Sequence, residues 1–186
     1  MSIYETCRYC EELHDVLALE PSFRMPDAYL AVPLAQREFR TMATKDACAI
    51  RDVDDSNRRY FLRVLAPFYV EGLPEPVSWG LWVEVKERDF QRVQELWNAP
   101  GQAEEPPFFG TIANRLPAYE NSLEITGIVT LTDPTHIPAF NATAPEDHRF
   151  VIEQRTGVST ERVAEWLAPI YHPDALASKP RSTPQS

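Results

Sequence analysis

The chain has 186 residues, of which 44% are hydrophobic and 25% are charged, a composition typical of a folded globular protein. This length fits one domain with one hydrophobic core, because ordinary domains run to about 100–200 residues. The 28 acidic and 18 basic residues give a formal net charge of −10, which disfavours nucleic acids and anionic lipid surfaces as partners.

The N-terminal stretch MSIYETCRYCEEL has neither a basic leader nor an apolar core of the kind found in signal peptides. No other stretch approaches the roughly 18 apolar residues that a membrane span needs. The three cysteines suit a reducing compartment better than a secreted disulfide framework. We therefore expect a cytoplasmic protein without a membrane segment.

Residues 1–15 form a candidate Cys/His knuckle. Two residues separate Cys7 from Cys10, and His14 follows Cys10 by four positions. Structural zinc takes four ligands, and Cys48 would complete a Cys₃His set, with His148 and His136 as substitutes for Cys48. In the alternative interpretation the cysteines stay reduced and pack as small hydrophobes. The spacing leaves both a structural zinc site and a metal-free knuckle open.

Three prolines interrupt residues 21–46, where only residues 34–42 are predicted to form a short helix or strand. Strands are predicted over residues 47–50 and 59–65, on either side of the polar turn DVDDSN. The turn resembles the start of a calcium loop, but Asn57 and Arg63 stand where such a loop requires glycine and glutamate. We therefore predict a β-hairpin whose turn is solvated and acidic.

Residues 77–85 alternate between apolar and other side chains, which predicts a half-buried strand. A helix is predicted over residues 89–97 from apolar side chains at three- and four-residue spacing. Further strands are predicted over residues 108–113 and 123–131. The sheet therefore occupies the middle of the chain.

Two helices are predicted near the C-terminus. Thr143 and Glu146 have capping-box spacing, and Gly157 would end the first helix in a left-handed cap. Ser159 is the predicted N-cap of the second helix, which has an apolar stripe at Val163, Trp166, Leu167 and Ile170. The proline-rich residues 173–186 are predicted to be a disordered tail.

The order of these elements favours the α+β class, with a mainly antiparallel sheet and two to four helices packed on it. We expect one domain over residues 1–172. The chain contains neither the G-x-G-x-x-G pattern nor the phosphate-binding G-x-x-x-x-G-K pattern. A nucleotide site is therefore not predicted.

Three residues form a candidate surface for a ligand or a partner. Trp82 is either a platform on an open sheet face or a core residue under a covering helix. Arg63, between two apolar residues, either pairs with an acid such as Glu84 or binds an anion. Asn114 completes the candidate set. Sequence alone nominates no catalytic residue here.

Several segments together resemble one bacterial family: CRYC with the following His14, KDACAI, FLR, SWGLWVEV, PPFFGTIANRLPAY and DHRFVIEQRTGVS. The family is catalogued as domain of unknown function 2199. The resemblance implies a small bacterial cytoplasmic protein and brings no assigned reaction, substrate or partner. Glu11 stands where the family pattern implies glycine, which weakens the zinc interpretation.

The features support two hypotheses for function. The first is a non-enzymatic protein that binds a protein partner or a small molecule, for example an immunity protein that neutralises a toxin. The second is an enzyme of unrecognised type, with a pocket near Trp82 and Arg63 or with Cys48 as nucleophile. A structural zinc is compatible with either.

Overall fold

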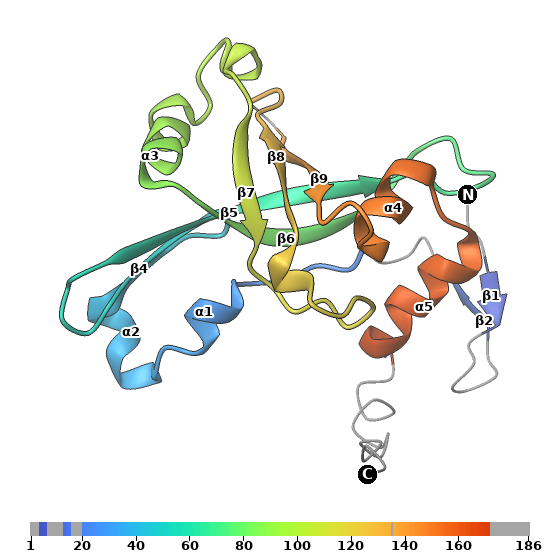
Figure 1. The fold of residues 1–186 in the computed structure, drawn as a ribbon, viewed down its shortest axis with the longest axis horizontal. Helices are drawn as coiled ribbons and strands as arrows, with labels where there is room; N and C mark the ends of the chain where they lie inside the picture. The colour runs from blue at the N-terminus through green and yellow to red at the C-terminus, as the bar shows by residue number, and fades with distance from the viewer. Residues whose placement is uncertain (1–3, 7–12, 16–19, 135, 172–186) are drawn as a thin grey trace.

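The structure is a computed structural model that describes residues 4–6, 13–15, 20–134 and 136–171 (Figure 1). Its main sheet has seven strands, and neighbouring strands in the chain are antiparallel neighbours in the sheet. The strands are β3 (Thr41–Ala43), β4 (Ala47–Arg51), β5 (Arg58–Phe68), β6 (Val77–Val85), β7 (Phe108–Ile112), β8 (Thr126–Thr130) and β9 (Ala139–Ala144).

A parallel pairing between β5 and β9 closes five of these strands into a barrel. The register partners are Leu65 and Ala139, and the Leu65 amide donates to the Pro138 carbonyl at 2.9 Å. A bulge opposite Thr126/Gly127 leaves Thr143 of β9 without a register partner on β8, and a Cβ at Gly127 would clash with the Asn141 carbonyl oxygen. The strands β3 and β4 extend the sheet beyond the barrel.

Five α-helices accompany the sheet: α1 (Asp27–Leu30), α2 (Leu34–Arg40), α3 (Glu87–Leu96), α4 (Arg149–Thr156) and α5 (Thr160–Tyr171). The predicted α+β class and antiparallel sheet are confirmed, but the described helices outnumber the predicted two to four. The additional one is α1, while α2 falls within residues 34–42, where a short helix or strand was predicted. None of the described helices is long and apolar enough to cross a membrane.

The N-terminal residues form a small antiparallel pair, β1 (Tyr4–Thr6) and β2 (Leu13–Asp15). This pair lies beside α5, apart from the main sheet (Figure 1). Residues 7–12 of the predicted knuckle lie outside the described residues, as do residues 173–186 of the predicted tail.

The sheet separates the buried apolar side chains into two clusters, where the sequence predicted one core. The larger cluster fills the barrel and includes Phe68, Trp79 and Trp166. The smaller lies on the other face and includes Cys48 and Trp82. Consequently β6 is buried on both faces, and the prediction of a half-buried strand was wrong.

A close approach of residues 21–23 to β6 explains this second cluster. The Gly80 amide donates to the Pro21 carbonyl and the Phe23 amide donates to the Gly80 carbonyl, both at 2.8 Å. A Cβ at Gly80 would lie 2.7 Å from Ser22 Oγ, so only glycine permits this approach without a shift. Ser22 thus forms a parallel bridge with Gly80 at the edge of β6. The residues that follow, Phe23, Met25, Ala28 and Tyr29, pack on the second cluster and cover the sheet face that alternation left apparently open.

The C-terminal helices differ from prediction at one boundary. Thr143 lies in β9, and α4 begins after His148, whose Nδ1 accepts a hydrogen bond from the Phe150 amide at 3.1 Å. Gly157 ends α4 at φ 85°, but its ψ of 172° is extended, not left-handed helical. In α5 the predicted stripe is confirmed at Val163, Trp166 and Leu167, which are all buried.

Candidate functional site

The three residues of the predicted binding surface lie close together, but the chain itself covers them. Arg63 and Trp82 are register partners on β5 and β6, so their side chains share one face of the sheet. Trp82 has no exposed surface, and its indole Nε1 donates to the Phe23 carbonyl at 3.1 Å. Trp82 is therefore a core residue, covered by residues 21–32 instead of by a long helix.

Asn114 anchors this covering segment. Its Oδ1 accepts from the Trp82 amide at 2.9 Å, while its Nδ2 donates to the Met25 carbonyl at 2.9 Å and to Asp27 Oδ1 at 3.2 Å. The Arg115 amide donates to the second Asp27 oxygen at 2.9 Å. Since Asn114 is fully buried, its amide is committed to holding the segment against the sheet.

Arg63 does not pair with Glu84, so that prediction was wrong. Arg63 lies 3.8 Å from Asp46 and donates to Ser22 Oγ at 3.2 Å. Glu84 instead accepts two hydrogen bonds from Arg59, at 2.8 and 2.5 Å. Glu84 lies opposite Phe61, diagonal to both arginines, and the Arg59 guanidinium stacks over the Phe61 ring. Arg63 therefore contacts the covering segment and not an open pocket.

Cys48 is fully buried on β4 among apolar side chains. Burial raises the pKa of its thiol from 9.0 to about 12, so the thiol is neutral at neutral pH. A nucleophile requires the thiolate. The structure therefore does not support Cys48 as a catalytic nucleophile.

The zinc site stays a prediction, because Cys7 and Cys10 lie outside the described residues. Within the described part of the chain, no group of three or more His, Cys, Asp or Glu side chains is arranged to hold a metal ion. The strand that carries His14, β2, lies beside α5, while β4 with Cys48 lies at the opposite side of the molecule (Figure 1).

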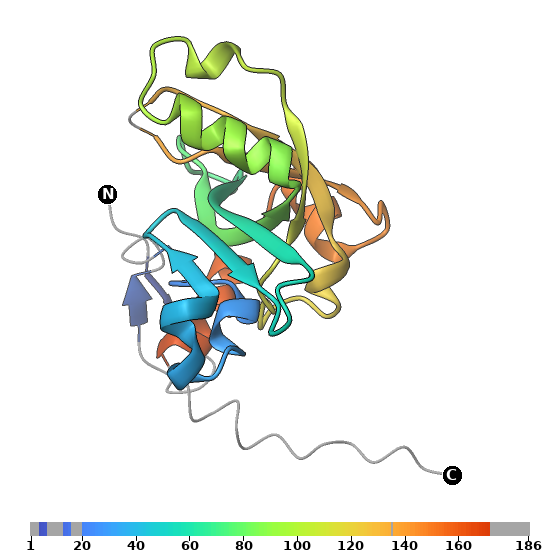
Figure 2. The same cartoon turned by 90° about the vertical axis from the view of Figure 1, so that its left-hand side faces the viewer.

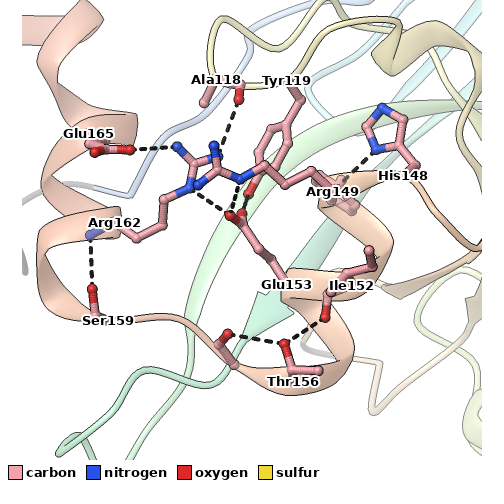
Figure 3. A network of polar contacts seen from close by, with 12 residues as sticks. Ala118, Tyr119, His148, Arg149, Ile152, Glu153, Thr156, Ser159, Arg162 and Glu165 are labelled. Carbon is pink, nitrogen blue, oxygen red and sulfur yellow. Dashed lines mark hydrogen bonds and ion pairs between the residues drawn. The ribbon is translucent and has the colours of Figure 1, made fainter.

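A buried ion-pair network that the sequence did not predict joins α4, α5 and the loop before Ser122 (Figure 3). The Glu153 carboxylate accepts from Tyr119 Oη at 2.5 Å, Arg149 Nε at 2.6 Å and Arg162 Nε at 2.9 Å. The side chains of Glu153 and Arg162 are only 13% and 11% exposed. Arg162 also donates to the Glu165 carboxylate at 2.8 Å and to the Ala118 carbonyl at 3.2 Å.

The contacts of this network hold α4, α5 and the loop before Ser122 together, and we call the network the clamp. Burial and the hydrogen bond to Glu153 raise the pKa of Tyr119, so the phenol stays protonated. Both ring nitrogens of the neighbouring His148 are hydrogen-bonded, Nδ1 to the Phe150 amide and Nε2 to the Glu120 carbonyl at 2.8 Å. These groups hold one another in place, and the Arg162 guanidinium also lies over the Tyr119 ring.

A different surface lies at the end of the sheet formed by α2, β3 and the β4–β5 connection (Figure 2). Three large apolar side chains are exposed there: Phe39 by 57%, Met42 by 54% and Val53 by 81%. Two shallow hollows of about 260 and 220 Å³ adjoin them, and Phe39, Arg40 and Arg51 line both hollows. We name Phe39, Arg40, Met42, Arg51 and Val53 the hairpin-end surface.

Backbone contacts fix the two arginines of this surface. Arg40 Nε donates to the Arg51 carbonyl at 3.0 Å, and Arg51 Nε donates to the Phe39 carbonyl at 2.7 Å. The smaller hollow is lined by Arg40, Arg51 and Arg58 together with uncharged residues, and by no carboxylate. Arg51 and Arg58 lie 3.8 and 3.6 Å from Asp55, so Arg40 is the arginine of this hollow that has no carboxylate partner among the described residues.

The hairpin-end surface was not predicted from the sequence, because most of it falls in residues 21–46, where the pattern did not distinguish helix from strand. One available signal was Val53, an isolated apolar residue within the polar turn DVDDSN. Such a residue has no strand partner to bury it, so exposure is the simplest expectation. The packing of α2 beside β3 had no comparable local signal.

The fold and these surfaces define an α+β protein with a five-stranded barrel and no recognised catalytic centre among its described residues. The profile of the family described as "Uncharacterized protein conserved in bacteria (DUF2199)" matches residues 6–158, so the chain belongs to this family. This confirms the resemblance noted from the sequence. No curated protein and no solved structure matches the chain.

Proposed function

We propose that this protein is a non-enzymatic binding protein whose protein partner docks on the hairpin-end surface. The observation that carries the proposal is the exposure of Phe39, Met42 and Val53 side by side around two hollows. Contiguous exposed apolar side chains with polar neighbours are characteristic of protein-interaction sites. Neutralisation of a partner, as by an immunity protein, is one role that such a surface serves.

The size of the hollows supports a protein partner over a small molecule. Both hollows are below the roughly 300 Å³ at which pockets for drug-sized ligands begin. Each can accept one or two side chains of a partner. Arginines beside exposed aromatic and methionine side chains are also enriched at protein interfaces.

Site-specific photocrosslinking in the native bacterial cells tests this proposal. The photoreactive residue p-benzoylphenylalanine replaces Phe39 or Val53 in the full chain, and Phe109 in a control. Phe109 is also highly exposed, by 68%, but lies on β7 outside the surface. We expect one discrete protein adduct from positions 39 and 53 and none from position 109. Equal adducts at all three positions, or none at any, would refute the proposal.

A further inference from the structure

The strand β3 has a free edge next to the hairpin-end surface. One edge of β3 pairs with β4, and no described strand pairs with the other edge. The backbone alternation identifies which groups face outward. The Thr44 amide donates to the Ala47 carbonyl at 2.8 Å, so Thr44 and Ala47 are a hydrogen-bonded pair. Because such pairs alternate along an antiparallel ladder, the next pair, Ala43 and Cys48, has no backbone hydrogen bonds between its two residues.

The pairing of β4 with β5, on the other side of β4, independently gives the same orientation of the Cys48 backbone. The Arg63 amide donates to the Asp46 carbonyl at 2.9 Å, which makes Cys48 and Phe61 a bonded pair. The backbone groups of Cys48 therefore point toward β5 and away from β3. The amide and carbonyl of Ala43 consequently face the free edge, where Ala43 is exposed.

The charge of the side chains beside this edge determines whether an acidic or a basic partner segment is favoured. Arg40 directly precedes β3, and continuing the register places it opposite Arg51 on β4. Strands lie about 5 Å apart, so a long acidic side chain on a strand added at β3 reaches the Arg40 guanidinium. Arg51 is one strand further away and lies 3.8 Å from its own partner, Asp55. Met42 and Ala49 line the same hollow and provide its apolar floor.

We infer that the partner docks by strand addition: an extended segment carrying Asp or Glu side chains pairs with the free edge of β3. This inference rests on the proposed function and specifies its partner. Main-chain bonds to Ala43 supply affinity, and a carboxylate on the added strand contacts Arg40. The Arg40 guanidinium attracts such a segment, while the acidic remainder of the chain repels it elsewhere.

The test combines the photocrosslinker at position 53 with substitutions at Ala43. Ala43→Pro removes the outward N–H, and proline is tolerated on the free edge of a strand. Ala43→Val retains the N–H and is the matched control. We expect at least a tenfold loss of adduct in Ala43→Pro and little change in Ala43→Val. Mass spectrometry of the cross-linked partner peptide should find Asp or Glu in it.

Each outcome separates the two proposals. An adduct that survives Ala43→Pro, or a cross-linked peptide that is basic, overturns strand addition and leaves the proposed function standing. Absence of an adduct in the unsubstituted background overturns both. Should Ala43→Pro not fold, hydrogen exchange replaces it: purified partner must slow exchange of the Ala43 amide at least tenfold, and unchanged exchange overturns the inference.

Discussion

The Glu153–Arg162 pair is expected to contribute substantially to stability. In Glu153→Gln, the 11%-exposed Arg162 loses its charged partner across the α4–α5 contact and keeps only Glu165. A net hydrogen bond to a charged group contributes about 1.5–3 kcal/mol, so losing the contacts to Arg162 and Tyr119 should cost about 3 kcal/mol. For a chain of this size the corresponding fall in Tm is roughly 6–12 °C.

Urea unfolding in a double-mutant cycle measures this directly. Glu153→Gln and Arg162→Met are made singly and together, and we expect a coupling free energy of about 2 kcal/mol. The matched control is Arg149→Met, because Arg149 contacts the same carboxylate but is 63% exposed, so its loss should cost less than about 1 kcal/mol. A coupling free energy below about 0.5 kcal/mol would refute the clamp.

Three further predictions concern the covering segment, the buried thiol and the metal. Asn114→Ala should cost about 2–4 kcal/mol and speed trypsin cleavage after the exposed Arg24, because the segment loses its anchor. With Cys7 and Cys10 replaced by serine, Cys48 should resist thiol reagents at pH 8 until urea unfolds the chain. The pKa of the Cys48 thiol is about 12 in the folded chain and 9.0 when the thiol is exposed, so its ionisation favours the unfolded chain as pH rises from 9 to 12. The Cys48→Val variant should therefore lose less stability over this pH range. Plasma mass spectrometry of chelator-free protein should find one zinc, lost in Cys7→Ser and kept in Cys48→Ala; absence of metal would refute the zinc prediction.

The local sequence pattern was sufficient to predict where the strands lie, but not which of their side chains are buried. Alternation over residues 77–85 predicted the bounds of β6 correctly. It did not reveal that Gly80 lies against Ser22 of another chain segment, or that Ser78 is buried, because small residues are equally compatible with solvent. The start of α4 was wrong because β9 continues past Thr143, with Ala142 and Ala144 on either side of it paired to β8, and this pairing outweighed the local capping signal. Long-range strand pairing of this kind has no local signature.

The candidate surfaces depend on contacts between distant parts of the chain. Tyr119 lies 34 residues before Glu153, and the two meet only because the barrel places the loop before Ser122 beneath α4. The sequence did group Arg63, Trp82 and Asn114 correctly in space. Their role was inverted, since a set of polar and aromatic groups that can hold a ligand can equally hold a chain segment.

The distribution of arginine partners connects the acidic composition to the proposed docking mode. Arg59 and Arg162 are matched to carboxylates within the fold, so their charge is neutralised internally. Arg40 differs, because its contacts within the described residues are to the Arg51 carbonyl and to the uncharged Gln36 side chain. A chain of net charge −10 that leaves this cation beside a free strand edge retains one place where an acidic segment is not repelled. The same arrangement protects the edge from pairing with a second copy of this chain: two acidic molecules repel each other, and a cationic flank on one edge meets a cationic flank on the other.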